Sequence, residues 1–314
     1  MNNKRILVTG GTGLIGTAIQ DQLKSKAEYE VFAPAKSTLN MTNQDQVAKV
    51  FNDYRPDVVI NLAAKVGGIL ANKMQPVEFF EDNLLIGLNT YKYSQKYGVK
   101  NIINAGAGCG YPLNANEPLM ESDLWNGVPQ IESIAYSTAK KLLTIMGDVY
   151  EKEYGIISTT FIPSNVYGPS DNFNLEKAHV VPALIHKFFL ATKNPDYKVE
   201  VWGSGSAKRD FIFVNDVATG MLGAIDAKNT NVINIATGKQ HSIKELAEEI
   251  SLAFNYNKEI IWNEKKPTGT NSREMNTDKI KNLISNWNPT PLRNGIAHTV
   301  NWFCENYLNS SIRK

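Results

Sequence analysis

The chain has 314 residues, of which 33 are Lys or Arg and 31 are Asp or Glu. A chain of this length can bury one large core or two unequal ones, and its balanced charge argues against nucleic acid and membrane surfaces as partners. The only cysteines, Cys109 and Cys304, are too few for a disulfide framework and are typical of a reducing compartment. No apolar stretch reaches the length of a membrane span, so we expect a cytoplasmic protein.

A glycine-rich turn follows the first predicted strand, residues 5–10, and precedes a predicted helix, residues 14–23. Glycines three residues apart allow a tight turn, close approach of the backbone to a pyrophosphate, and a helix N-terminus that faces the anion. A strand before and a helix after this pattern predict dinucleotide binding, with a purely structural glycine turn as the alternative. The predicted cofactor-binding residues of this turn are Gly10, Thr12, Gly13, Leu14, Ile15 and Gly16.

The end of the second predicted strand bears on which dinucleotide binds. An NAD site normally places Asp or Glu there, to hold the ribose hydroxyls. This sequence instead has Lys36, followed by two hydroxyl residues, Ser37 and Thr38. A cation with hydroxyls suits a 2′-phosphate, so the sequence favours NADP(H) over NAD(H). The alternative is that Lys36 is a solvated loop charge.

Strands and helices alternate through the first half of the chain, which predicts an α/β fold with a Rossmann-like, doubly wound parallel sheet. A buried-type strand at 57–62 leads into Ala63 and Ala64, small residues that would let a cofactor lie close. Further predicted elements are a helix at 79–97, a strand before Cys109, a helix that ends at Gly155 and a strand at 156–162.

The alternation fades from about residue 168, where we predict a smaller C-terminal α/β substrate domain. We assign 1–167, with about 211–237, to the NADP-binding domain, and 168–210 with 238–314 to the substrate domain. Beyond this point the predicted elements are a strand at 231–235 that returns to the main sheet, a helix at 242–254 with a capping box, a strand at 260–262, a polar loop at 265–274 and a helix at 296–308.

Tyr136 and Lys140 stand four residues apart in AYSTAKKLL. Residues at that spacing share a helix face, so a phenol and an ammonium can point at one bound molecule. An ordinary, partly exposed helix face is the alternative. By itself the pair is weak evidence for a catalytic site, and the predicted dinucleotide-binding turn at the N-terminus strengthens it.

Several motifs together resemble the GDP-L-fucose synthase family of extended short-chain dehydrogenases/reductases, which use NADPH and a GDP-4-keto-6-deoxy sugar. The resemblance covers essentially the whole chain and is carried by TGGTGLIG (9–16), AAKVGGI (63–69), CGYP (109–112), YSTAK (136–140), NVYGPSDNF (165–173), AHVVPALI (178–185) and VWGSGSAKRDF (201–211). It implies 3,5-epimerisation followed by reduction at C4, in a homodimer whose helices, from about 84–97 and 136–150, form a four-helix bundle. Those apolar helix residues are equally consistent with an internal core.

The resemblance also implies roles for individual residues. Tyr136 would protonate the C4 oxygen, while Lys140 holds the nicotinamide ribose and lowers the pKa of Tyr136. Cys109 and His179 would be the base and acid of epimerisation, with His179 also near the cofactor. Lone cysteines and histidines are commonly structural, and only these motifs favour the catalytic interpretation.

Substrate binding would fall to residues on the family's matching positions, namely Asn165, Lys187, Trp202 and Arg209, with Arg273 as a weaker candidate. The two cations Arg209 and Lys187 would neutralise the diphosphate, and Trp202 would face the guanine or ribose. A core aromatic and an ordinary surface charge are the alternatives for Trp202 and Arg209. The four histidines are scattered without ligand spacing, so we expect no metal.

One position departs from the family pattern. Ala107 stands where the family has a Ser or Thr that donates a hydrogen bond to the C4 oxygen, and Gly108 beside it also lacks a hydroxyl. Losing one such donor typically costs about a hundredfold to a thousandfold in rate. The alternatives are therefore an enzyme that only reduces or only epimerises another GDP-4-keto sugar, of the 6-deoxyheptose or colitose type, and a non-catalytic cofactor-binding protein.

Overall fold

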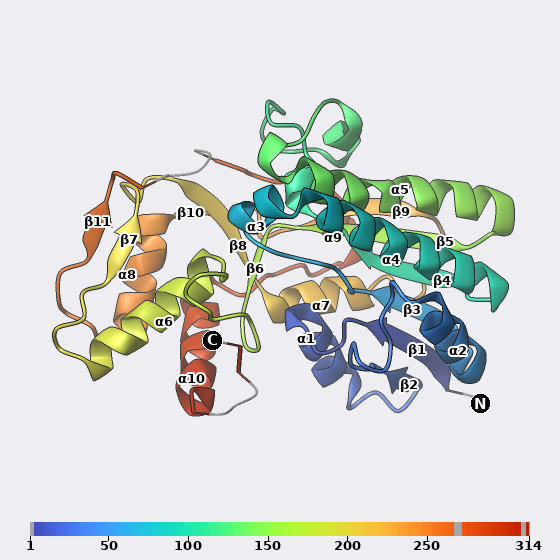
Figure 1. The fold of residues 1–314 in the computed structure, drawn as a ribbon, viewed down its shortest axis with the longest axis horizontal. Helices are drawn as coiled ribbons and strands as arrows, with labels where there is room; N and C mark the ends of the chain where they lie inside the picture. Colours follow the sequence, from blue (N-terminus) through green and yellow to red (C-terminus); the bar gives the residue numbers. More distant parts are fainter. Residues whose placement is uncertain (1–2, 267–271, 309–311, 314) are drawn as a thin grey trace.

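The computed structural model describes residues 3–266, 272–308 and 312–313. Six parallel strands form its central sheet, in the order β2-β1-β3-β4-β5-β9 (Figure 1). The strands are β1 (Lys4–Thr9), β2 (Tyr29–Phe32), β3 (Val58–Asn61), β4 (Asn101–Ala105), β5 (Ile157–Pro163) and β9 (Asn231–Ile235). The strand order reverses between β1 and β3, and in open α/β sheets ligands bind beyond the carboxyl ends of the strands at such a point.

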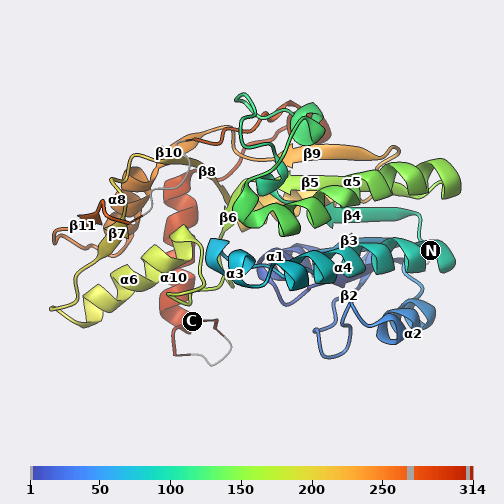
Figure 2. The same cartoon turned by 45° about the horizontal axis from the view of Figure 1, so that its top comes forward.

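Helices cover both faces of this sheet, which confirms the predicted doubly wound α/β fold (Figures 1 and 2). One face packs against α1 (Leu14–Leu23), α7 (Val214–Leu222) and α9 (Asp278–Leu283). The other face packs against α2 (Gln44–Tyr54), α4 (Pro76–Lys96) and α5 (Ile134–Tyr154). The central strands β3 and β4 are buried and are accordingly rich in Val and Ile, as expected for a covered parallel sheet.

A second group of elements lies beside the sheet, at the left of Figure 1. It comprises α6 (Val180–Lys193), α8 (Ile243–Ala253), α10 (Leu292–Asn306) and a two-stranded sheet of β7 (Glu200–Trp202) and β11 (Ile261–Asn263). Buried aromatic side chains, Phe188 and Phe303 among them, form its core. Between the two groups runs a three-stranded sheet of β6 (Asn165–Tyr167), β8 (Lys208–Phe213) and β10 (Gln240–Ser242). This sheet takes strands from both predicted domains, so our division of the chain stays a prediction.

The remaining elements are α3 (Ile69–Met74) and three short 3-10 helices, η1 (Gly108–Gly110), η2 (Glu121–Trp125) and η3 (Ile131–Ser133). The predicted capping box of α8 is present, since Ser242 and Glu245 each bond the other's backbone N–H. The last helix begins at Leu292 rather than 296, directly after Pro291, a residue that fits a helix start. Part of the predicted polar loop, 267–271, lies outside the described residues. In the described part of the chain, no helix combines the length and apolarity needed to cross a membrane.

Candidate active site

The glycine turn lies at the switch point of the sheet, between the carboxyl ends of β1 and β3. Gly10 has a φ of +66°, and a Cβ there would lie 2.8 Å from the backbone N of Ala63. A Cβ on Gly16 would lie 2.5 Å from the carbonyl oxygen of Gly10. The turn therefore requires glycine at both positions, and it brings the segment after β3 against the start of α1.

The residues around this turn fit a dinucleotide. Gly13 bonds back to the Gly10 carbonyl with its N–H and precedes the N-terminus of α1, whose free N–H groups suit a pyrophosphate. Thr12 is exposed, as is Lys36 beyond β2, so both are open to a ligand. Leu14 and Ile15 pack partly against the core, and Ala63 and Ala64 are half-buried. The contacts of these residues with a cofactor stay predictions.

Tyr136 and Lys140 lie in the first two turns of α5, and the ring of Tyr136 packs edge-on against Phe79 of α4 at 6.3 Å between centroids. Only 4% of Lys140 is exposed, and burial lowers its pKa to about 8. Burial raises the pKa of Tyr136, and the neighbouring Cys109 raises it further. This differs from the expectation that Lys140 lowers the pKa of Tyr136, because desolvation penalises the charged forms of both side chains.

Cys109 lies on η1, which packs against the start of α5. Its Sγ is 3.1 Å from the Oγ of Ser137, which in turn is 3.2 Å from the Oγ of Ser133. Burial raises the pKa of the Cys109 thiol, whereas the two serine hydroxyls and the positive charge of Arg273 oppose that rise. The site thus surrounds a half-buried thiol with the donors and the cation that favour a thiolate.

Ala107 follows β4 directly and is extended, with φ −151° and ψ 130°. The glycines beside it have packing roles. A Cβ on Gly108 would lie 2.8 Å from the Cε of Met275, and a Cβ on Gly110 would lie 3.1 Å from the Cγ of Lys141. No side-chain hydroxyl is therefore available from residues 107 and 108.

Arg273 links the thiol to the predicted substrate residues. It reaches η1 from the segment after β11, where its Nη1 donates to the Gly108 carbonyl at 3.4 Å. Burial lowers the pKa of Arg209 and the nearby Arg273 lowers it further, with Glu117 acting in the opposite direction on both guanidinium groups. Asn165 donates to the Asp210 carbonyl next to Arg209. The guanidinium group of Arg273 near the thiol, with that of Arg209 close enough to repel it, suits an anionic substrate.

The other predicted substrate residues lie on α6 and β7. Lys187 donates to the carbonyl of Glu200 at 2.7 Å, two residues before Trp202. Trp202 is 56% exposed, so the core-aromatic interpretation is wrong, and Lys266 lies over its ring. His179 precedes α6 and is exposed, and desolvation by the surrounding protein lowers its pKa. The place of these three residues in one site with Cys109 stays a prediction.

Comparison with known proteins identifies the chain's relatives. The model of the NAD dependent epimerase/dehydratase family matches residues 6–236. The chain belongs to this family. It is 32% identical to the GDP-L-fucose synthase of Escherichia coli, over 98% of each protein. The structure of a GDP-L-fucose synthetase from Naegleria fowleri bound to NADP superimposes with a TM-score of 0.93 and 32% identity, covering 100% of this chain and 96% of that one.

Another solved relative in the comparison is a GDP-mannoheptose C4 reductase from Campylobacter jejuni with NADP bound. It is 30% identical, with a TM-score of 0.86, over 97% of this chain and 99% of that one. The expected family and fold are thus confirmed.

Sequence reasoning missed three residues of the site: Phe79, Ser133 and Ser137. The two serines are four residues apart, and Ser137 directly follows Tyr136, so helical spacing places them on one face. That spacing was the available signal. Their approach to Cys109, 28 positions away, is a tertiary contact without a local signature.

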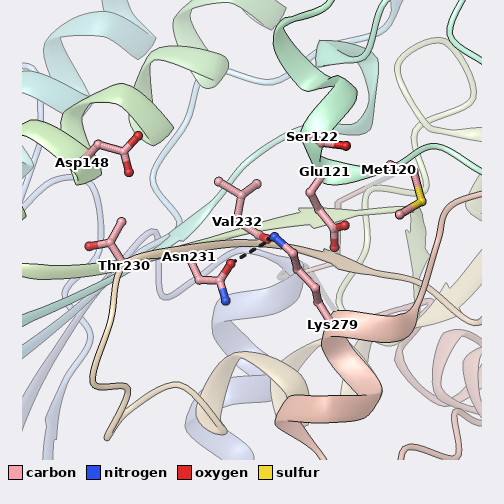
Figure 3. Close-up of a pocket in the computed structure, with 8 residues that line it drawn as sticks. All are labelled: Met120, Glu121, Ser122, Asp148, Thr230, Asn231, Val232 and Lys279. Atoms are coloured by element: carbon pink, nitrogen blue, oxygen red, sulfur yellow. Dashed lines mark hydrogen bonds between the residues drawn. The ribbon is translucent and has the colours of Figure 1, made fainter.

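A separate hollow of about 350 Å3 lies between η2, β9, α5 and α9 (Figure 3). Lys279 lies across it and donates to Asn231 and to the Val232 carbonyl. None of the predicted site residues lines this hollow. Among the described residues, no group of three or more His, Cys, Asp or Glu side chains is placed to hold a metal ion.

Proposed function

We propose that the chain catalyses the NADPH-dependent conversion of GDP-4-keto-6-deoxy-D-mannose to GDP-L-fucose, by 3,5-epimerisation and then 4-keto reduction. The observation that carries this proposal is the assembly of Tyr136, Lys140 and Cys109 at the carboxyl end of β4, beside a glycine turn that fits a dinucleotide. The names of the relatives support the same activity.

In the epimerisation, Cys109 takes a proton from the carbon next to the ketone as a thiolate. The C–H bond breaks, an S–H bond forms, and the electron pair is held as an enolate on the C4 oxygen. His179, whose pKa burial lowers so that its imidazolium gives up a proton more readily, returns a proton on the other face.

In the reduction, Tyr136 donates its phenolic proton to the C4 oxygen as that oxygen becomes an alkoxide. Bound NADPH supplies the hydride that C4 receives. Lys140 holds the nicotinamide ribose, while Lys36 and the turn at Gly10 hold the phosphates. Arg209, Arg273 and Lys187 hold the GDP diphosphate, with Asn165 and Trp202 beside them. The raised pKa of Tyr136 keeps its proton in place until the oxygen needs it.

A second candidate is a reductase or an epimerase of another GDP-4-keto sugar, because Ala107 removes a donor that both half-reactions use. The C. jejuni reductase, which acts on a GDP-heptose by name, supports this candidate. A third candidate is a non-catalytic cofactor-binding protein. Retention of Cys109, Tyr136, Lys140 and His179 argues against it.

The test is to incubate the purified protein with GDP-4-keto-6-deoxymannose in deuterated water, with and without NADPH. We expect deuterium at C3 and C5 in both cases, and loss of the 340 nm absorbance when NADPH is present. Cys109→Ala should abolish deuterium uptake, whereas Tyr136→Phe should abolish NADPH consumption and keep deuterium uptake. Cys304→Ala, an exposed cysteine on α10, should change neither.

The other outcomes separate the candidates. NADPH consumption without deuterium uptake would indicate a reductase, and uptake without consumption an epimerase. NADPH binding with neither signal on any GDP-4-keto sugar would contradict an enzymatic function.

We further propose that the protein is a cytoplasmic homodimer that pairs through α4 and α5. These helices lie side by side, and Leu85, Leu88, Ile145 and Val149 expose between 37% and 49% of their surface. Such an apolar face on two adjacent helices is typical of an interface that a second copy covers. Two unpaired cysteines support a reducing compartment.

A further inference from the structure

Cys109 is the only thiol near the proposed active site in the described part of the chain, and two serine hydroxyls extend from it into the protein. Ser137 is fully buried in the first turn of α5, and Ser133, on η3, is 9% exposed. The Sγ–Oγ distance to Ser137 is 3.1 Å, the Oγ–Oγ distance to Ser133 is 3.2 Å, and Ser133 Oγ lies 3.4 Å from the Gln130 carbonyl oxygen. The result is a short row of polar atoms that ends on a backbone acceptor.

Each hydroxyl carries one hydrogen and can also accept one, so the hydrogen bonds along the row can all point toward the sulfur or all point away from it. When Cys109 is a thiol, its S–H can donate to Ser137, Ser137 to Ser133, and Ser133 to the Gln130 carbonyl. When Cys109 is a thiolate, Ser133 donates to Ser137 and Ser137 donates to the sulfur. Every hydroxyl hydrogen then has an acceptor in both states, and only rotation about the Cβ–Oγ bonds separates them.

We propose that Ser137, supported by Ser133, is a positioning residue that stabilises the Cys109 thiolate and aims its sulfur for proton abstraction. This inference rests on the proposed role of Cys109 in epimerisation. The row does not carry the abstracted proton away, because the carbonyl at its end has no proton to exchange. The proton stays on the sulfur until it returns to the sugar or to water.

Other ionisable groups also act on Cys109. Arg273 approaches from the segment after β11, and Tyr136 and Lys140 approach from α5. The positive charge of Arg273 favours the thiolate, and burial disfavours it. A buried anion needs hydrogen-bond donors as well as a nearby cation, and Ser137 is the side-chain donor that the structure places on the sulfur. The effect of Ser137 on the pKa of Cys109 can therefore be measured separately from that of Arg273.

The test measures the thiol itself. In a Cys304→Ser background, Cys109 is the sole cysteine, and its alkylation by iodoacetamide can be followed by mass spectrometry from pH 7 to 10.5. We expect Ser137→Ala to move the midpoint of the pH–rate profile upward and to slow alkylation at pH 8 about threefold to tenfold. The range reflects the loss of a hydrogen bond to a charged group, partly offset because a thiolate of higher pKa is more nucleophilic.

Two further variants test whether a shifted midpoint is specific to the row of hydroxyls at Cys109. Ser133→Ala should move the midpoint in the same direction by less, because the hydroxyl of Ser133 lowers the pKa of Cys109 less than that of Ser137 does. Ser94→Ala is the matched control, since Ser94 is an equally buried helical serine on α4 whose Oγ has no hydrogen-bond partner in the described part of the chain. Thermal unfolding of each variant reports whether the fold is kept, and a midpoint, unlike a rate, does not depend on how easily the reagent enters.

An unchanged midpoint in Ser137→Ala, or an equal shift in Ser94→Ala, would overturn the proposal. The alkylation uses no sugar substrate, so its outcome is distinct from that of the deuterium experiment. If Ser137→Ala shifts the midpoint while the wild-type protein takes up no deuterium, the proposed function fails and the effect of Ser137 on the thiol stands. If the protein does epimerise, Ser137→Ala should lower kcat for deuterium uptake more than it changes KM, and raising the pH should partly rescue it.

Discussion

At the scale of single residues, Ala107 is the position where this chain departs most from the chemistry that we propose for it. A hydroxyl there would donate to the C4 oxygen in both half-reactions. We therefore expect Ala107→Ser to raise kcat for NADPH oxidation about tenfold or more, because enzymes that lose one hydrogen-bond donor to an oxyanion become slower. Steady-state kinetics at 340 nm would measure the change.

The matched control for this gain is Ala107→Val, which adds volume without a hydroxyl and should not raise kcat. An equal gain in both variants would show that packing, not hydrogen bonding, limits the rate. No gain in Ala107→Ser would mean that another group or a water already serves the C4 oxygen.

Lys140 gives the site a pH dependence. Burial lowers its pKa to about 8, so the ammonium is present below that pH and is lost above it. Because the protonated form is the one that binds the ribose hydroxyls, NADPH affinity should fall by about tenfold as the pH rises from 7 to 9.5. Isothermal titration calorimetry across this range would show the fall.

Lys140→Met should bind NADPH weakly and without this pH dependence. Lys141→Met is the matched control, since Lys141 is also buried but lies over the ring of Trp125 instead. It should keep the wild-type profile. A flat profile in the wild-type protein would contradict the assignment of Lys140 to the cofactor.

At the scale of elements, the turn between β1 and α1 depends on close backbone contacts. A Cβ on Gly16 would lie 2.5 to 2.7 Å from backbone atoms of Gly10 and Gly11, so the turn must shift to admit it. We expect Gly16→Ala to destabilise the fold by about 1–3 kcal/mol and to weaken NADPH binding. Chemical denaturation and calorimetry would measure the two effects.

Gly68→Ala offers the comparison, because no atom of the described residues lies within 4 Å of a Cβ added there and the φ of Gly68 is −65°. Its stability should match the wild type within about 0.5 kcal/mol. If Gly16→Ala were equally stable and bound NADPH normally, the turn would not be the close-packed phosphate site that its geometry indicates.

The elements also show which features a sequence can predict. The capping box of α8 and the glycine turn are local, because their key positions are three residues apart in the sequence, and both were predicted. The approach of Arg273 to Gly108 was not, since it depends on a bridge between Leu119 and Met275, which are far apart in the chain. The contact of Ser137 with Cys109 was missed for the same reason. Local patterns thus predict the elements and many site residues, while the surroundings that tune the pKa values come from tertiary packing.

At the scale of the whole molecule, the exposed apolar face of α4 and α5 is the feature that a single copy leaves unexplained. Leu85 and Leu88 are one turn apart on α4, as are Ile145 and Val149 on α5, so each helix exposes an apolar pair, and the two helices lie side by side (Figure 2). We refer to these four side chains as the apolar patch. Burying such a patch against its own copy gives a two-fold symmetric contact in which each residue is used twice.

If this patch is the dimer contact, a charge at its centre should separate the subunits, because an unpaired carboxylate buried in an apolar interface is costly. We expect Ile145→Glu to elute with a mass near the 34.9 kDa of one chain in size-exclusion chromatography with light scattering, where the wild type has about twice that mass. Leu252→Glu, on the exposed side of α8, carries the same charge away from the patch and should remain dimeric. A wild-type monomer, or a dimer that survives Ile145→Glu, would rule out this face as the contact. The glycine turn at Gly10 is formed within one chain, so each copy should hold its own cofactor. NADPH binding by the separated subunit would show this.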